Sequence, residues 1–396
     1  MRIGIIKPDW RIAGGFEKVV ARVENDLKVD GHEVRRFELD VPSLPRQPFG
    51  VPIGSADWDR SPEWFAHMTM LDRFRGMNVE WADLVVSTQP PSYAVRHPRH
   101  LSLFYHHARI FYDLSGVWIR AGLAQAGLHN AAAEMLRKAE LSDFEAVSHF
   151  LAGSERVAER LRFYQGPGVP LSLYQAAAPQ VELRSGAKLS YVLCVSRHEF
   201  TKRTELVVQA LAMCHGQEGI LAGGGGRLPF VRALAADLAD GSVDAAELTD
   251  GRTWLNSGLI GENPSHSEHP WIHILGRVGD DQLDELYRGA LCIVAPAYDE
   301  DDGLTVLEAM AHAKPVIVCR DGGGLTSMVR DGVNGFMVEP TAAGIAAAIG
   351  DLAADRGQAV EMGIAGREAV LGRTAQRAKE QLLTAVELVR SGGSRT

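Results

Sequence analysis

Short apolar runs alternate with longer amphipathic segments along most of the chain. The first run covers residues 2–7, and the segment from Phe16 to Lys28 that follows repeats its apolar side chains three or four positions apart, as one face of a helix does. Gly31 ends this segment, and a second run begins at Glu33. Short strands separated by helices are typical of parallel sheets with right-handed crossovers. The pattern therefore predicts an α/β protein.

The alternation is interrupted once. Residues 166–188 are rich in Pro, Gly and Ala and carry no long period, so we interpret them as a connection between two domains. The alternation resumes at Tyr191, and an amphipathic helix is expected near the end of the chain. The sequence thus predicts three parts: an N-terminal Rossmann-like domain at 1–180, a second Rossmann-like domain at 181–373, and a C-terminal helix with a tail at 374–396 that crosses back to the first domain.

Composition narrows the classes of partner. The 41 Lys and Arg against 50 Asp and Glu give a net charge of -9, which argues against binding to nucleic acid, because that needs a basic surface. No apolar run approaches the roughly 18 residues of an integral membrane segment. The four cysteines are far apart and are expected as buried thiols. We expect a cytoplasmic protein, with peripheral attachment at a membrane as an alternative.

The stretch around Glu300 and Glu308 is the most informative for chemistry. A strand is expected to end at Pro296 and a helix to begin near Gly303. Ligands of open α/β sheets bind at the carboxyl ends of strands, and helix N-terminal amides favour anions. The two carboxylates would face a ligand from the loop and from the helix. The alternative is structural, because Thr305-x2-Glu308 also matches a capping box.

Taken together, these residues resemble the signature of retaining family-4 glycosyltransferases. The signature consists of Glu300-x7-Glu308 with Gly303-Leu304-Thr305 between the two acids, and Ser196-Arg197-x4-Lys202 and Gly14-Gly15-x-Glu17 resemble two further segments of the family. The resemblance implies the GT-B fold, in which two Rossmann-like, doubly wound domains face a cleft. The second domain would bind the donor and the first the acceptor.

The resemblance also implies roles for individual residues. Glu308 would bind the ribose hydroxyls of a nucleotide-sugar, and Glu300 the hydroxyls of the transferred sugar. Arg197 and Lys202 would neutralise the diphosphate and stabilise the charge that develops on it as it leaves. The main chain would contribute near the diphosphate at five positions: Gly303, Leu304, Thr305, Gly14 and Gly15.

Two histidines follow the expected strand Leu101–Tyr105. The resemblance implies that one of them lies near the transferred sugar. The spacing Tyr105-x-His107 favours His107, and His106 is the alternative.

The implied activity is that of a retaining glycosyltransferase. It would transfer a sugar from a nucleotide-diphospho-sugar to a hydroxyl of a small-molecule, glycan or lipid-linked acceptor in the interdomain cleft. We expect no cofactor and no metal, because the two cations and the helix amides offset the phosphate charge. Asp301-Asp302 stands where the family commonly has Gly-Phe, and its effect on the choice of donor sugar stays open. A non-catalytic nucleotide-sugar-binding protein and a nucleotide-sugar epimerase of the same fold are the alternatives, and the sugar, base, acceptor and oligomeric state stay open.

Overall fold

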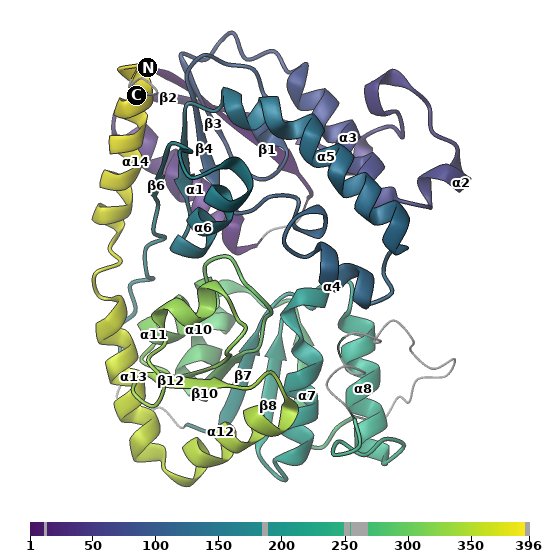
Figure 1. Ribbon diagram of the computed structural model, residues 1–396. Helices are drawn as coiled ribbons and strands as arrows, with labels where there is room; N and C mark the ends of the chain where they lie inside the picture. The colour runs from purple at the N-terminus through teal and green to yellow at the C-terminus, as the bar shows by residue number, and fades with distance from the viewer. Residues whose placement is uncertain (12–13, 184–188, 249–253, 255–267, 393–396) are drawn as a thin grey trace. The chain divides into compact units, whose positions relative to one another are not determined.

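The structure is a computed structural model that describes residues 1–11, 14–183, 189–248, 254 and 268–392 (Figure 1). Its internal contacts divide the chain into two compact units. Unit 1 comprises Met1–Ala177 together with Ala375–Thr396, and unit 2 comprises Ala178–Thr374. In the part of the chain that the structure describes, no helix has the length and apolar character needed to cross a membrane.

Unit 1 is built on a six-stranded parallel sheet with the order β2-β1-β3-β4-β5-β6. Chain connections reverse direction between β1 and β3, so these neighbours form the switch point of the sheet. The central strands are entirely buried, which explains their continuous apolar runs. The strands are β1 (Arg2–Asp9), β2 (Glu33–Asp40), β3 (Leu84–Ser87), β4 (His100–Phe104), β5 (His149–Ala152) and β6 (Leu171–Leu173).

The helices of unit 1 bury the apolar faces that the sequence predicted. In α1 the buried side chains include Val19, Val20, Val23 and Leu27, all on the expected stripe. The last helix, α14, packs against β4, β5 and α1, and is therefore part of unit 1. The helices are α1 (Gly15–Val29), α2 (Ser55–Trp58), α3 (Pro62–Arg75), α4 (Ser115–Arg120), α5 (Ala126–Ala146), α6 (Glu155–Gln165) and α14 (Ala375–Arg390).

Unit 2 repeats the architecture with the strand order β12-β11-β10-β7-β8-β9, again all parallel. Its switch point lies between β7 and β10, which pair directly. The strands are β7 (Tyr191–Val195), β8 (Glu218–Ala222), β9 (Ile272–Gly276), β10 (Ala290–Ala295), β11 (Val316–Cys319) and β12 (Gly335–Val338).

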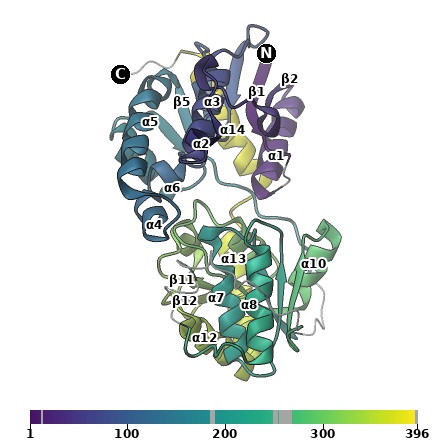
Figure 2. The ribbon, with the colours of Figure 1, turned by 90° about the vertical axis from the view of Figure 1, so that its right-hand side faces the viewer.

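Helices cover both faces of the second sheet. On one face α7 lies between α8 and α12, and α10, α11 and α13 pack on the other (Figures 1 and 2). One apolar cluster joins β7, β10 and β11 to α7 and α12. The helices are α7 (Thr204–Met213), α8 (Leu228–Asp240), α10 (Asp280–Gly289), α11 (Leu304–Ala311), α12 (Ala342–Ala354) and α13 (Arg356–Val370).

One segment differs from its prediction. Residues 166–188, interpreted as a connection, contain β6, which pairs with β5 at the edge of the first sheet. Its three residues are only half-buried, so no apolar run marks it. A strand this short carries no readable period.

Candidate functional site

The switch point of unit 2 brings two sequence-predicted loops together. The loop after β7 carries Arg197 and Lys202, and the loop after β10 carries Glu300. Because β7 and β10 are neighbouring parallel strands, both loops leave the same edge of the sheet side by side. Open α/β sheets bind ligands at this position.

The two loops touch through charged side chains. The Lys202 ammonium forms an ion pair with the Glu300 carboxylate, and the two side chains are 20% and 19% exposed. The main chain of Glu300 is fixed as well, since its N–H donates to the Gly322 carbonyl over 3.0 Å and its carbonyl accepts from the Gly324 N–H over 2.7 Å. An anion that binds here would compete with Glu300 for the ammonium.

Arg197 lies on the same loop, with an exposed side chain. The loop around it is held by the turn after β8, because the His198 N–H donates to the Gly224 carbonyl over 2.8 Å. A Cβ at Gly223 would stand 1.8 Å from the Ser196 carbonyl oxygen, so this close approach requires glycine. The guanidinium is therefore presented from a firmly held main chain.

The start of α11 adjoins this loop pair. Gly303 is the N-cap in a left-handed conformation (φ 100°), which glycine adopts without strain. The amides of Leu304 and Thr305 then open the helix, where the dipole favours an anion. The capping-box alternative for Thr305 is wrong, because Gly303 is the N-cap, Thr305 is already a residue of the helix, and its hydroxyl donates to the Val195 carbonyl over 3.4 Å. Thr305 thus ties the helix start to β7.

Glu308 is oriented by a hydroxyl that the sequence analysis did not identify. The buried Tyr287 of α10 donates its hydroxyl to Glu308 Oε2 over 2.8 Å. Burial, together with the nearby Glu308 carboxylate, raises the pKa of Tyr287 well above its usual value, so the phenol stays protonated and able to donate. The Tyr287 ring stacks on His312 with centroids 4.8 Å apart, and His312 Nε2 lies 2.9 Å from an Asp284 carboxylate oxygen. The sequence signal that could have identified Tyr287 is a tyrosine at a core-facing position of the expected helix, because a buried hydroxyl needs a partner.

The acidic run before α11 is not uniformly solvated. Asp302 is 3% exposed and lies 3.4 Å from the Arg373 guanidinium. Burial raises the pKa of Asp302 to about 6, Arg373 opposes this shift, and Asp301 and Glu300 add to it. Burial is thus the main cause, and the repulsion from the neighbouring acids is a smaller one.

In unit 1, burial distinguishes the two candidate histidines. His107 is fully buried and stacks on Tyr112 with centroids 4.4 Å apart, while Phe104 and Phe144 pack around it. His106 is half-buried, with Nδ1 2.7 Å from the His107 carbonyl oxygen. The preference for His107 is therefore not supported by its surroundings, and His106 is the ring more accessible to a ligand.

The loop after β4 rests on a buried carboxylate. Glu140 is fully buried and accepts from the hydroxyls of Tyr93 and Tyr112 over 2.5 and 2.7 Å, and His67 Nε2 lies 2.6 Å away. Since Tyr112 also stacks on His107, this network fixes the main chain that carries both histidines.

Gly14 and Gly15 stand at the start of α1. Gly14 has an extended backbone (φ -156°), which any residue adopts, and a Cβ there would meet only Glu17 Oε2 at 3.4 Å. Among the described residues of unit 1, none therefore requires glycine at position 14.

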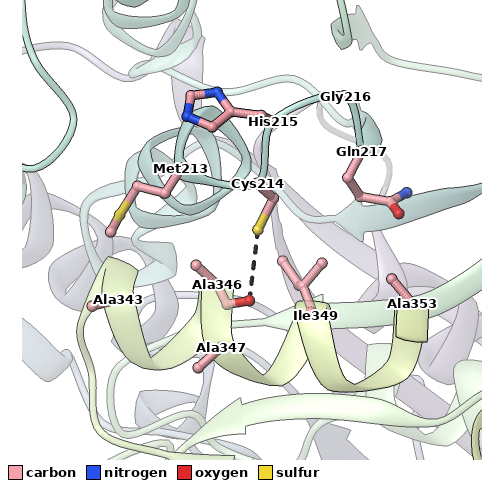
Figure 3. Close-up of a pocket in the computed structure, with 11 residues that line it drawn as sticks. Met213, Cys214, His215, Gly216, Gln217, Ala343, Ala346, Ala347, Ile349 and Ala353 are labelled. Atoms are coloured by element: carbon pink, nitrogen blue, oxygen red, sulfur yellow. Dashed lines mark hydrogen bonds between the residues drawn. The ribbon is translucent and has the colours of Figure 1, made fainter. Parts of the chain in front are cut away.

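A cavity of about 600 Å³ lies elsewhere in unit 2, between the end of α7 and α12 (Figure 3). Its lining consists of small and apolar side chains of α12 and the segment Met213–Gln217. Cys214, expected as a buried thiol, is half-buried here, with Sγ 3.6 Å from the Ala346 carbonyl oxygen. None of the predicted site residues lines this cavity.

Among the described residues no group of three or more His, Cys, Asp or Glu side chains is arranged to hold a metal ion. The absence of a metal requirement stays a prediction.

Comparison with known proteins identifies the part of unit 2 that holds the two acids. Residues 269–369 match the family model "Glycosyl transferases group 1". The chain carries a glycosyltransferase group 1 domain. This domain includes Glu300, Glu308 and the start of α11, whereas Arg197 and Lys202 lie outside the matched residues.

Curated relatives named D-inositol 3-phosphate glycosyltransferase match parts of the chain. The protein from Nocardiopsis dassonvillei is 28% identical over 217 residues, 48% of this chain and 43% of that protein. The protein from Mycolicibacterium vanbaalenii is 32% identical over 182 residues, 44% of this chain and 36% of that protein. These matches span less than half the length of either relative.

Solved structures match over nearly the whole chain. Sucrose-phosphate synthase from Thermosynechococcus elongatus has a TM-score of 0.70 at 18% identity and covers 98% of this chain and 99% of its own. Anabaena HepE in complex with UDP and glucose has a TM-score of 0.63 at 16% identity and covers 97% and 99%. At this identity the likeness shows the fold alone. These likenesses confirm the predicted α/β fold with two Rossmann-like units, the GT-B fold.

Proposed function

We propose that the chain is a retaining glycosyltransferase that moves a sugar from a nucleotide-diphospho-sugar to an acceptor hydroxyl. The observation that carries the proposal is the arrangement at the switch point of unit 2. There Lys202 contacts Glu300 beside the start of α11, and Glu308 is oriented on that helix by Tyr287. A cation, helix amides and two carboxylates suit a ligand that combines phosphate with hydroxyls.

The group 1 domain match supports glycosyl transfer, and the HepE complex shows a protein of this fold with UDP and glucose bound. We therefore take UDP-glucose as the first donor to test. In this proposal Glu308 binds the ribose, Glu300 binds hydroxyls of the sugar, and the amides of Gly303, Leu304 and Thr305 bind the diphosphate.

The chemistry follows from those assignments. The bond between the anomeric carbon and the phosphate oxygen breaks, and its electron pair stays on the diphosphate. The acceptor oxygen bonds to the anomeric carbon from the same face, and its proton passes to the leaving phosphate oxygen. Arg197, Lys202 and the helix amides stabilise the charge that builds up on that oxygen. In unit 1 we assign the contact with the sugar to His106.

A donor panel tests the proposal. The protein is incubated with UDP-glucose, UDP-N-acetylglucosamine or GDP-mannose, each with and without D-inositol 3-phosphate and simple sugars as acceptors. Transfer that depends on an acceptor supports the proposal. Conversion of a donor by itself into a different nucleotide-sugar would instead indicate an epimerase, and tight binding without turnover would indicate a binding protein.

Replacement of one carboxylate tests the site. Glu308→Gln keeps the shape but loses the charge that two ribose hydroxyls would share, so we expect kcat/KM to fall about 100-fold or more. Glu361→Gln, an exposed glutamate of α13, is the matched control and should retain wild-type activity. Equal activity in both variants would exclude the assigned role of Glu308.

A further inference from the structure

The residue after Lys202 is buried in an unusual conformation. Arg203 is 1% exposed and is the largest fully buried side chain among the described residues. Its backbone is left-handed (φ 47°), a region that side-chain-bearing residues seldom adopt. A strained backbone of this kind persists only where surrounding contacts hold it.

Those contacts come from three other segments, at residues 254, 296–298 and 321. The guanidinium fork donates to both carboxylate oxygens of Asp321, over 2.9 and 2.6 Å, and Nε donates to the Pro296 carbonyl over 2.8 Å. The rings of Trp254 and Tyr298 lie over the guanidinium with centroids 4.9 and 5.6 Å away. A bidentate fork fixes orientation as well as distance, which a lysine cannot do.

The segment that begins at Asp321, which Arg203 binds, also holds the loop that carries Glu300. The Asp299 N–H donates to the Asp321 carbonyl over 2.8 Å, and the Glu300 N–H donates to the Gly322 carbonyl over 3.0 Å. On the other side, the Tyr298 N–H donates to the Thr201 carbonyl over 2.7 Å. Three segments, at residues 200–203, 296–300 and 321–324, are therefore joined both by these main-chain hydrogen bonds and by the contacts of one guanidinium.

We propose that Arg203 is a positioning residue which, together with Asp321, sets the separation between the Lys202 ammonium and the Glu300 carboxylate. Asp321 balances the charge of Arg203, so Arg203 acts through its neighbours and not on a phosphate directly. This inference rests on the proposed function, because it assigns the place of the two groups said to contact the diphosphate and the sugar. It adds to the proposed function the requirement that Arg203 and Asp321 hold the loops of Lys202 and Glu300 in place.

Three variants separate the effect of the guanidinium fork of Arg203 from the effect of its left-handed backbone. Arg203→Gly removes the fork and places at this position the residue best suited to a positive φ. Arg203→Lys keeps the charge and loses the fork, and Asp321→Asn keeps the shape and loses the charged acceptor. Arg367→Ala is the control, because Arg367 also joins two segments, through the carbonyls of Ala311 and Val181 over 2.7 and 2.8 Å.

Steady-state kinetics with UDP-glucose is the first readout, on variants whose folding is checked by thermal melting. We expect kcat to fall about 10- to 100-fold in Arg203→Gly and Asp321→Asn, with a smaller change in KM, because misplaced groups slow the reaction more than they weaken donor binding. Arg203→Lys should fall between wild type and Arg203→Gly. Arg367→Ala should lose thermal stability and keep kcat. The same result is expected for the replacement of any residue whose role is merely structural. A wild-type kcat in folded Arg203→Gly and Asp321→Asn would overturn the inference.

Crystal structures give a second readout that does not depend on turnover. The contact between Lys202 and Glu300 should persist in wild type and Arg367→Ala and be lost in Arg203→Gly or Asp321→Asn. An intact contact in both of these would overturn the inference even for an active enzyme. A wild-type protein without transfer in the donor panel would refute the proposed function, and the crystal structures would still decide the positioning role.

Discussion

Replacing Tyr287 with phenylalanine tests how Glu308 is held. The change removes the hydroxyl that donates to Glu308 Oε2 over 2.8 Å and keeps the ring that stacks on His312. A hydrogen bond to a charged group contributes about 1.5–3 kcal/mol, and about 1.4 kcal/mol corresponds to a tenfold change in an equilibrium constant. We therefore expect Tyr287→Phe to raise the KM for UDP-glucose about 10-fold or more. Because Glu308 is assigned to the ribose and not to the reacting atoms, kcat should change little.

The assay is steady-state kinetics over a range of UDP-glucose concentrations. The control is Tyr191→Phe, in which the same substitution removes a hydroxyl that donates to the Leu286 carbonyl over 2.9 Å. Both variants lose one hydrogen bond, but only Tyr287→Phe releases the carboxylate of Glu308. If the two variants had the same KM for UDP-glucose, Tyr287 would not be what orients Glu308 for donor binding.

Three further outcomes are expected. The pKa of Asp302 is raised to about 6 by burial, so its contribution to stability is fully present below the unfolded pKa and is lost as the pH rises through about 6. In urea titrations, the free energy of unfolding of wild type should therefore increase by about 1–3 kcal/mol relative to that of Asp302→Asn when the pH is lowered from about 7 to about 4. A difference between the two proteins that stays constant with pH would contradict this. Glu140→Gln replaces a buried charged acceptor shared by Tyr93 and Tyr112, and should lower the free energy of unfolding by about 2–4 kcal/mol in the same assay, whereas a loss below about 1 kcal/mol would show that the charge is not needed. Transfer from UDP-glucose should persist in excess EDTA, and activity that returns only with added divalent metal would disprove the metal-free chemistry.

Much of the fold could be predicted from local pattern. The stripe of Val19, Val20, Val23 and Leu27 identified α1, because a helix that packs on a sheet must bury one face. The apolar runs of the central strands were readable for the same reason. The edge strand Leu171–Leu173 was missed because three half-buried residues carry no period.

The site was only partly predictable. The sequence placed Lys202 and Glu300 at strand ends, but their contact joins residues 98 positions apart and depends on β10 lying beside β7. No local pattern encodes that strand order. Arg203 would be expected in solvent after a lysine, and its burial depends on Asp321, 118 positions later.

The two histidines illustrate the same limit. The sequence placed both after β4, but which ring faces the core depends on Tyr112 and Phe144, which pack around His107. The capping-box interpretation of Thr305 failed similarly, because Gly303 begins the helix and Thr305 binds a carbonyl of another strand. In each case one of the deciding contacts, Phe144 for His107 and Val195 for Thr305, comes from a part of the chain distant in sequence.

The anomeric configuration of the product tests the central claim most directly. The product of the first productive donor and acceptor pair is followed from the earliest times by NMR, and the configuration at the transferred anomeric carbon is read from its proton coupling. We predict that the product keeps the anomeric configuration of the donor. A product with inverted configuration would contradict it.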